Sequence, residues 1–116
     1  MLGPTGHLLE HYLDLLSLRQ RVTASNIANA DTPGYRAREL DFHFEMQSLL
    51  NQPPGAGSPP APVVRQTWGA ARNDGNNVNL EREMMALADT QVRFALASLL
   101  LRNKVRGLRS VLQETR

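Results

Sequence analysis

The sequence predicts a mainly α-helical chain, in which two long terminal helices form a coiled-coil hairpin joined by an irregular, extended Pro-rich middle segment. Two observations support this: apolar residues recur at three- and four-residue intervals near both ends, and five prolines and two glycines gather at 51–62. We therefore divide the chain into an N-terminal helical segment (1–31), an irregular segment (32–78) that contains a flexible linker (51–62), and a C-terminal heptad helix (79–116).

Composition limits the chain to one small domain. Its 116 residues are 41% hydrophobic and only 5% aromatic, which predicts that it has no large core of its own. The lack of cysteine excludes disulfides and thiolate zinc sites, and the net charge is only +2. The first residues lack the pattern of a secretory signal, and no uninterrupted apolar run approaches bilayer length. We expect no cleavable signal, no membrane span and no direct lipid binding.

The first helix is expected to run from Gly6 or His7 to Ala30. Its apolar positions repeat with helical spacing and form one stripe: Leu8, Leu9, Tyr12, Leu15, Leu16, Val22 and Ile27. At a rise of about 1.5 Å per residue, this helix would be about 35 Å long.

A specific turn ends the first helix. Pro33 restricts Thr32 to extended conformations, so the helix must stop by about Asp31. With Pro33 at its second position and Gly34 at its third, the segment 32–35 predicts a type II turn, because Pro presets φ and Gly accepts positive φ.

Polar side chains flank this turn. Asn26 and Asn29 lie three apart on the last helical turn, where their amides are expected to bond the free carbonyls there or a neighbouring chain. Tyr35 follows the turn and is a candidate anchor for an inter-subunit pocket; local packing against the first helix is an equal alternative.

The middle segment predicts little regular structure. Prolines and glycines preclude a helix or an interior strand at 51–62. Short extended pieces are expected on either side, at about 40–44, where Phe42, Phe44 and Met46 alternate with polar residues, and at 62–66.

The second helix is expected to start at Asn79, a favourable N-cap, with Glu81 and Glu83 in its first turns. From there a seven-residue repeat runs the length of the helix, and eight of its ten positions are apolar: Leu80, Met84, Leu87, Gln91, Phe94, Ser98, Leu101, Val105, Leu108 and Leu112. We call these positions the predicted seam. Such a repeat predicts a left-handed supercoil and requires a partner helix.

Further apolar residues lie off the predicted seam. Leu96, Leu99, Leu100 and Val111 widen the apolar surface of the second helix, and contact with other subunits would bury them. The alternative is that the linker folds back over them. Gly107, inside the helix, suggests a close backbone approach.

Residues with catalytic or metal-binding chemistry are scarce. His7 and His11 have a spacing that can bind a metal, but no third ligand is evident. Ser25 has no base beside it in the sequence, and no Gly-rich loop could hold a phosphate. We expect no enzymatic activity, no cofactor and no metal.

Two segments carry a family resemblance. Asn-Ile-Ala-Asn at 26–29, followed by Thr-Pro-Gly-Tyr at 32–35, resembles the N-terminal signature of bacterial flagellar rod, hook and hook-associated proteins. The segments 36–42 and 74–84 resemble the proximal rod B proteins in particular. Together with the heptad helix, the resemblance covers roughly residues 15–50 and 72–113.

The resemblance implies a structural subunit of the proximal rod in the flagellar basal body, on the periplasmic side of the inner membrane. The chain would pass unfolded and uncleaved through the flagellar type III export channel, and its terminal helices would polymerise into the inner tubular layer. The implied neighbours are proximal rod protein C, the rod adaptor protein FliE, the export gate and the surrounding membrane ring. The implied helix-packing and polymer interface comprises Leu8, Tyr12, Leu15, Val22 and the eight apolar seam positions.

Phe42 and Met46 fit the loose aromatic-plus-aliphatic pattern of early flagellar export substrates, in which this pair is thought to contact the export gate. Ordinary packing is the alternative role for the pair.

Three other functions stay open at this point. The chain could be another axial rod protein, such as proximal rod protein C, or a cytoplasmic coiled-coil adaptor or chaperone that buries the predicted seam in a closed dimer. A third is nucleic-acid binding by the basic C-terminal helix. Its positive charges are too few for this function, and aromatic residues are too sparse; the charged residues are Arg102, Lys104, Arg106, Arg109 and Arg116.

Overall fold

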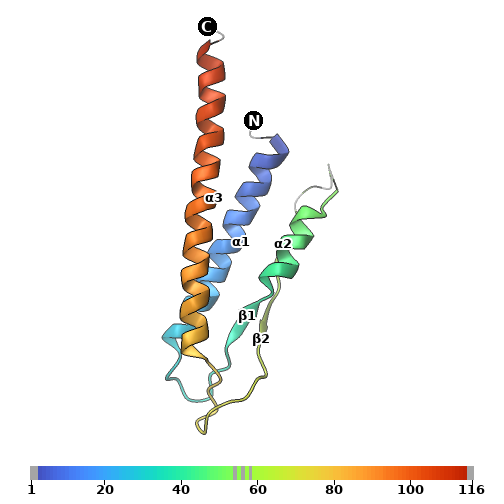
Figure 1. Ribbon diagram of the computed structural model, residues 1–116. Coiled ribbons are helices and arrows are strands. Elements are labelled where there is room, and N and C mark those ends of the chain that lie inside the picture. The colour runs from blue at the N-terminus through green and yellow to red at the C-terminus, as the bar shows by residue number, and fades with distance from the viewer. Residues whose placement is uncertain (1–2, 54, 56, 58, 115–116) are drawn as a thin grey trace.

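The computed structural model describes residues 3–53, 55, 57 and 59–114. The elements in chain order are α1 (Gly3–Ala28), β1 (Arg38–Leu40), α2 (Phe42–Leu50), β2 (Val64–Gln66) and α3 (Leu80–Glu114). The molecule is long and flat, with extents of 68 × 27 × 15 Å. α1 and α3 run antiparallel and α3 extends beyond the start of α1, while α2 and the two strands lie on the other side of α1 (Figure 1). The prediction of a mainly helical chain with long terminal helices is confirmed.

The first helix occupies nearly the predicted residues. α1 begins a few residues earlier than expected and ends at Ala28 instead of Ala30. Its buried residues are Gly6, Leu15, Leu16, Thr23 and Asn26. Leu8, Tyr12 and Val22 are half-buried, so the predicted apolar stripe does face the rest of the molecule.

The prediction of an extended piece at 40–44 holds only for Leu40, which ends β1, and is wrong from Phe42, where α2 starts. Asp41 is its N-cap, and the Asp41 carboxylate accepts a hydrogen bond of 3.1 Å from the backbone N–H of Phe44. This bond satisfies one of the N–H groups that a helix start leaves without a partner. The spacing of Phe42 and Met46, four residues apart, therefore belongs to one face of a helix.

The two strands form a short antiparallel ribbon. Arg38 pairs with Gln66, and Leu40 pairs with Val64. The extended piece predicted at 62–66 is thus confirmed over its last three residues. In the predicted linker, Pro54, Ala56 and Ser58 lie outside the described residues, and the described part of 51–62 is neither helix nor strand.

α3 begins as predicted but turns a different face toward α1. Asn79 caps the helix, since its side-chain oxygen accepts a 3.1 Å bond from the backbone N–H of Arg82. The fully or almost fully buried residues of α3 are Thr90 and Ala97, which are not seam positions. Leu80, Met84 and Phe94, which are seam positions, are exposed.

The physical reason is side-chain size. Small residues such as Thr90 and Ala97 let two helices approach closely. Because the Thr90 hydroxyl donates to the Ala86 carbonyl at 2.7 Å, burying Thr90 leaves this hydroxyl with a partner. Further along α3 the prediction holds better, since Leu101, Val105 and Leu108 are half-buried. Gly107 is exposed, and a Cβ added there would meet nothing within 4 Å, so it marks no close approach inside the chain.

The buried apolar core is small. Among the residues that the structure describes, it consists of Leu15, Leu16, Ala37, Val78 and Ala97. Most of the large apolar side chains of α3 are instead exposed. The chain therefore buries little apolar surface of its own, as its composition predicted.

α3 is also long and apolar enough to cross a membrane by length and composition alone, with a mean hydropathy of 1.3 over its most apolar window. The expectation from the sequence concerned uninterrupted apolar runs, which this average over a window does not test. The helix carries Asp89 in ion pairs with Arg19 and Arg93, however, and helices that pack against protein meet the same two criteria.

Candidate functional site

The turn after α1 has the predicted geometry. The backbone N–H of Tyr35 donates to the Thr32 carbonyl at 3.2 Å, and Gly34 has a φ of +75°. Because Pro33 precedes a glycine with positive φ, the turn is of type II. It sends the chain back along α1.

Asn26 holds the returning chain against α1. Its side-chain N–H donates to the Arg38 carbonyl at 2.7 Å, and its side-chain oxygen accepts the Arg38 N–H at 2.9 Å. The Asn26 side chain is 1% exposed. It therefore pairs with the start of β1 and not, as expected, with a carbonyl at the helix end or with a neighbouring chain.

Asn29 and Tyr35 make local contacts. The Asn29 side chain donates to the Ser25 carbonyl at 2.8 Å, as predicted for the end of a helix. The Tyr35 hydroxyl donates to the Asn26 side-chain oxygen at 3.1 Å and lies 3.3 Å from the Ser25 hydroxyl. Tyr35 is half-buried, so the structure shows the local packing that was the alternative to an inter-subunit anchor.

The second signature segment folds directly against the turn. The backbone N–H of Gly34 donates to the Asp74 carbonyl at 2.8 Å. Gly75 has a φ of +83°, and a Cβ added to it would lie 3.2 Å from the Cα of Gly34. Only glycine accommodates both the backbone conformation and this close approach.

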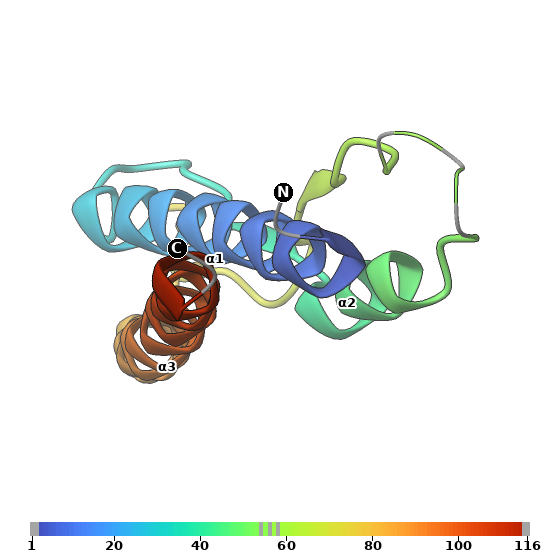
Figure 2. The same ribbon diagram turned by 90° about the horizontal axis from the view of Figure 1, so that it is seen from above.

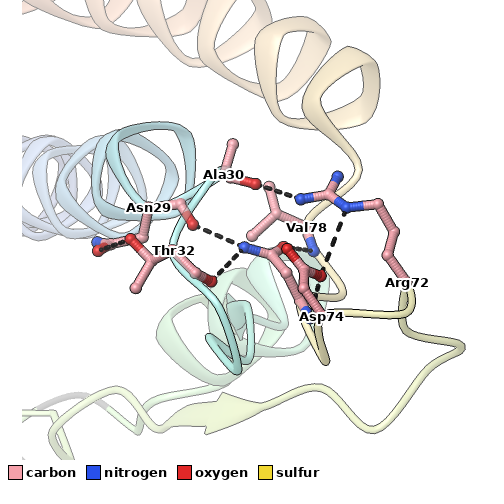
Figure 3. Close-up of polar contacts among 7 residues, drawn as sticks. Asn29, Ala30, Thr32, Arg72, Asp74 and Val78 are labelled. Atoms are coloured by element: carbon pink, nitrogen blue, oxygen red, sulfur yellow. Dashed lines mark hydrogen bonds and ion pairs between the residues drawn. The ribbon is translucent and has the colours of Figure 1, made fainter.

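Asn76 joins the two segments from a fully buried position, and Figure 3 shows the groups that it links, among them Asn29, Thr32 and Val78. Its side-chain N–H donates to the carbonyls of Asn29 at 2.8 Å and Thr32 at 2.9 Å. Its side-chain oxygen accepts the Val78 N–H at 2.8 Å. Asn76 thus satisfies carbonyls that the end of α1 and the turn leave without a helical partner.

Asn77 and Arg72 complete the contact. Asn77 accepts the Ala37 N–H at 2.6 Å and donates to the Thr67 carbonyl at 3.0 Å. The Arg72 guanidinium donates to the Ala30 carbonyl and lies 3.8 Å from the Asp74 carboxylate (Figure 3). We call Asn26, Asn76 and Asn77, with the turn at 32–35, the asparagine clasp.

The meeting of these two segments is not predicted by the sequence. Asn76 and Thr32 are 44 residues apart, and no local pattern pairs them. The run Asp-Gly-Asn-Asn at 74–77 was the available signal, because asparagine amides commonly bond backbone groups in turns.

A second cluster joins α2 to both long helices. The Asp89 carboxylate accepts bonds from Arg19 at 2.8 Å and Arg93 at 2.9 Å. The two guanidinium groups lie 4.8 and 5.5 Å from the centre of the Phe42 ring, and the Tyr12 ring lies 5.9 Å from it. We call these five residues the arginine–aromatic cluster, in which cation–π contact supports ring packing.

The charges in this cluster perturb each other. Hydrogen bonds from Arg19 and then Arg93 lower the pKa of Asp89 below its ordinary value of 3.8. Hydrogen bonds with Tyr12 and then Asp89 raise the pKa of Arg93. Both shifts favour the charged forms, so this cluster acts as an electrostatic tie between α1 and α3.

The remaining predicted site residues fall into two groups. Met46 is half-buried one turn beyond Phe42 on α2. Of the predicted interface, the buried or half-buried residues are Leu8, Tyr12, Leu15, Val22, Leu87, Leu101, Val105 and Leu108. The exposed residues are Leu80, Met84, Phe94 and Leu112.

No metal-binding constellation is found in the part of the chain that the structure describes, where no three His, Asp or Glu side chains gather. His7 lies 3.5 Å from Glu10, one turn along α1.

Comparison with known proteins is consistent with these features. A family model described as flagella basal body rod protein matches residues 13–36, which span the second half of α1 and the turn. The chain is 32% identical over 120 residues to the flagellar basal body rod protein FlgB of Escherichia coli (strain K12), covering 87% of each chain. It is 29% identical over 121 residues to FlgB of Yersinia enterocolitica, and this match covers 88% of each chain. It is 32% identical over 110 residues to FlgB of Borrelia hermsii, and this match covers 77% of this chain and 81% of the Borrelia protein.

Proposed function

This chain belongs to the flagellar basal body rod protein FlgB family and is a structural subunit of the rod, not an enzyme, and we propose that it polymerises there through its two long helices. The observation that supports polymerisation most directly is the exposure of the apolar side chains on α3. Met84, Leu96 and Leu100 are each more than half exposed, although the chain has few aromatic residues and a small core. Apolar patches of this kind mark protein contacts.

The proposed polymer is open and helical. A contact between two different surfaces of identical subunits continues indefinitely unless its rotation closes a ring. The chain offers different surfaces on α1 and α3, because the two helices have different lengths and bury different sets of residues. We propose that the paired helices, supercoiled as a coiled coil in the assembled rod, form its inner tubular layer.

We further propose that the chain is exported unfolded and uncleaved by the flagellar type III system. Phe42 and Met46 are the proposed contacts with the export gate. In the folded chain both are half-buried on α2, and Phe42 lies beneath the Arg19 and Arg93 guanidinium groups. A gate that binds these side chains must therefore meet them before the helices pack, which agrees with export of an unfolded chain.

The subunit assembles with other rod components of the basal body. The specific neighbours that we propose are proximal rod protein C, the rod adaptor protein FliE, and the export gate with the membrane ring around it. The proposed position is the proximal rod, on the periplasmic side of the inner membrane, after export from the cytoplasm.

Fractionation tests this function against a cytoplasmic adaptor. An epitope-tagged copy, produced in the bacterium that carries this chain, is expected to co-purify with detergent-extracted basal bodies at a stoichiometry of several copies per particle. Recovery only in the cytoplasmic fraction, as a closed dimer, would contradict the proposal. Deletion of the coding sequence is expected to abolish rods and motility, and the untagged chain should restore both.

A further inference from the structure

The face of α3 that points away from α1 carries an apolar stripe, which is interrupted between Met85 and Val92 by Asp89, the partner of Arg19 and Arg93. Met85, Val92, Leu96 and Leu99 recur at intervals of seven, four and three residues, and they are 68%, 61%, 58% and 47% exposed. With 3.6 residues per turn, they lie roughly 140° around the helix from the buried Thr90 and Ala97. We call these four residues the outer stripe. Contact with α1 cannot bury the outer stripe, because α1 occupies the other face.

A groove lies between α1 and α2. It has a volume of about 550 Å³, and its apolar lining includes Leu15, Leu18, Phe44, Leu49, Pro62 and Val63. Phe44 and Val63 are at least half exposed. The buried carboxylate there, Glu45, already accepts a hydrogen bond of 3.2 Å from the Val63 N–H. Asp14 and Arg21 also line the groove, but most of its lining is apolar.

The outer stripe and the groove lie on different sides of the molecule. Seen from above, α3 lies to one side, while α2 and the segment that lines the groove lie to the other, and α1 passes between them (Figure 2). The two surfaces therefore cannot meet within one chain. Between two copies they can meet in the same way repeatedly.

The two surfaces also lie at the same height along the molecule. Arg19 of α1 bonds Asp89 of α3, and Tyr12 of α1 and Arg93 of α3 both lie against the Phe42 ring. The groove residues Leu15 and Leu18 lie between Tyr12 and Arg19 on α1. They are thus level with the middle of the outer stripe, so a neighbour displaced sideways would bring its outer stripe level with the groove.

We propose that the outer stripe of one copy of this chain seats in the α1–α2 groove of the next copy. This deepens the proposed function, on which it rests, by naming the two faces of the lateral contact. The contact is heterologous and uses a helix in an apolar groove, so it extends into an open array. It also buries Phe44 and Val63 of one copy with Leu96 and Leu99 of the other.

Disulfide trapping tests the pairing, because the chain contains no cysteine. A double variant with Leu96→Cys and Ser48→Cys places one thiol on the outer stripe and one in the groove. Upon mild oxidation of the purified full-length chain, we expect a ladder of dimers, trimers and larger species on non-reducing gels. The matched control combines Leu96→Cys with Gln20→Cys, an exposed α1 position that does not line the groove, and should form no ladder.

Other cross-linking results would overturn the pairing. Absence of the ladder in the Leu96→Cys and Ser48→Cys variant, or a dimer formed only through two Leu96→Cys thiols, would exclude this contact. Flotation with anionic phospholipid vesicles in place of the ladder would show that the outer stripe binds lipid instead.

A charge substitution gives a second measurement. Leu96→Asp is expected to raise the protein concentration needed for self-association by about tenfold, because it places a carboxylate in an apolar contact. Asn103→Asp is the control, since it adds the same charge one heptad further along this face, beyond the outer stripe. Equal effects of the two substitutions would count against the pairing.

The outcomes separate this inference from the proposed function. If the double cysteine variant co-purifies with basal bodies and no adduct forms within them, the rod function stands and the pairing is wrong. If the unmodified chain does not co-purify with basal bodies, the proposed function itself fails, whatever the purified chain forms in solution.

Discussion

The side-chain amide of Asn26 pairs with the backbone of Arg38 as a strand would, donating to its carbonyl at 2.7 Å and accepting its N–H at 2.9 Å. One buried side chain thereby fixes the path of the chain after the turn. Asn76 has the equivalent task for the second segment, since it bonds the carbonyls of Asn29 and Thr32. The base of the molecule is consequently held together mainly by polar contacts.

Asn26→Ala is expected to lower the free energy of unfolding by about 2 kcal/mol, because it leaves buried backbone groups of Arg38 without partners. Urea denaturation followed by circular dichroism measures this change. Ser25→Ala is the control, since the exposed Ser25 hydroxyl makes only a 3.3 Å contact with Tyr35, and should change stability by less than about 0.5 kcal/mol. Equal effects of the two substitutions would mean that the asparagine clasp adds little stability.

Two glycine substitutions are expected to have opposite effects. Gly75→Ala should destabilise the chain by at least about 1 kcal/mol, because its φ of +83° is strained for alanine and the new methyl group would press on Gly34. Gly107→Ala should stabilise α3 by about 0.5–1 kcal/mol, because the site is open and alanine favours helix. Thermal melting of both variants checks this, and a stabilising Gly75→Ala would contradict the close contact of the two segments.

Asp89 predicts a specific dependence of stability on pH. Its pKa is lower in the folded chain than the ordinary 3.8, so its ion pairs stabilise the fold above pH 3.8, and this stabilisation is lost as the pH falls through the lower folded-state value. Since Asp89 is about half exposed, the contribution at neutral pH should be below about 1 kcal/mol.

Urea denaturation across this pH range compares the chain with Asp89→Asn. The variant should be less stable at pH 6, and the difference should disappear at acidic pH. A constant difference at every pH would show that the carboxylate charge is not its cause.

Phe42→Ala is expected to reduce the amount of chain exported without reducing its synthesis, if Phe42 contacts the export gate as proposed. Immunoblots of whole cells and of exported fractions measure both quantities. Phe44→Ala on the same helix is the control, because Phe44 is 59% exposed and is not part of the proposed pair with Met46. Normal export of the Phe42→Ala chain would remove the basis for the gate contact.

Local chemistry made several elements predictable. Pro33 and Gly34 specify the type II turn through their own φ angles, and Asn79 specifies the start of α3 through its side-chain bond to the Arg82 N–H. The start of α2 could have been predicted by the same reasoning, since Asp41 is a favourable N-cap. The brief alternation of Phe42, Phe44 and Met46 led instead to a strand.

The choice of the α3 face that contacts α1 was not predictable from spacing. The heptad pattern favoured the large side chains of Leu80 and Met84, whereas the structure buries Thr90 and Ala97. An apolar residue has the same hydrophobicity whether it faces its own chain or a neighbour. Periodicity therefore shows that α3 has apolar faces but does not assign a partner to each.

By itself, the sequence determined the two long helices, the turn between α1 and β1, and the family, because each depends on residues close together in the chain. Only the tertiary structure decided that Asn76 bonds Thr32, that the Phe42 ring lies against the guanidinium groups of Arg19 and Arg93, and that the outer stripe faces away from α1. These contacts depend on how closely distant segments can approach and on which backbone groups lack partners when they do. Both are properties of the folded chain.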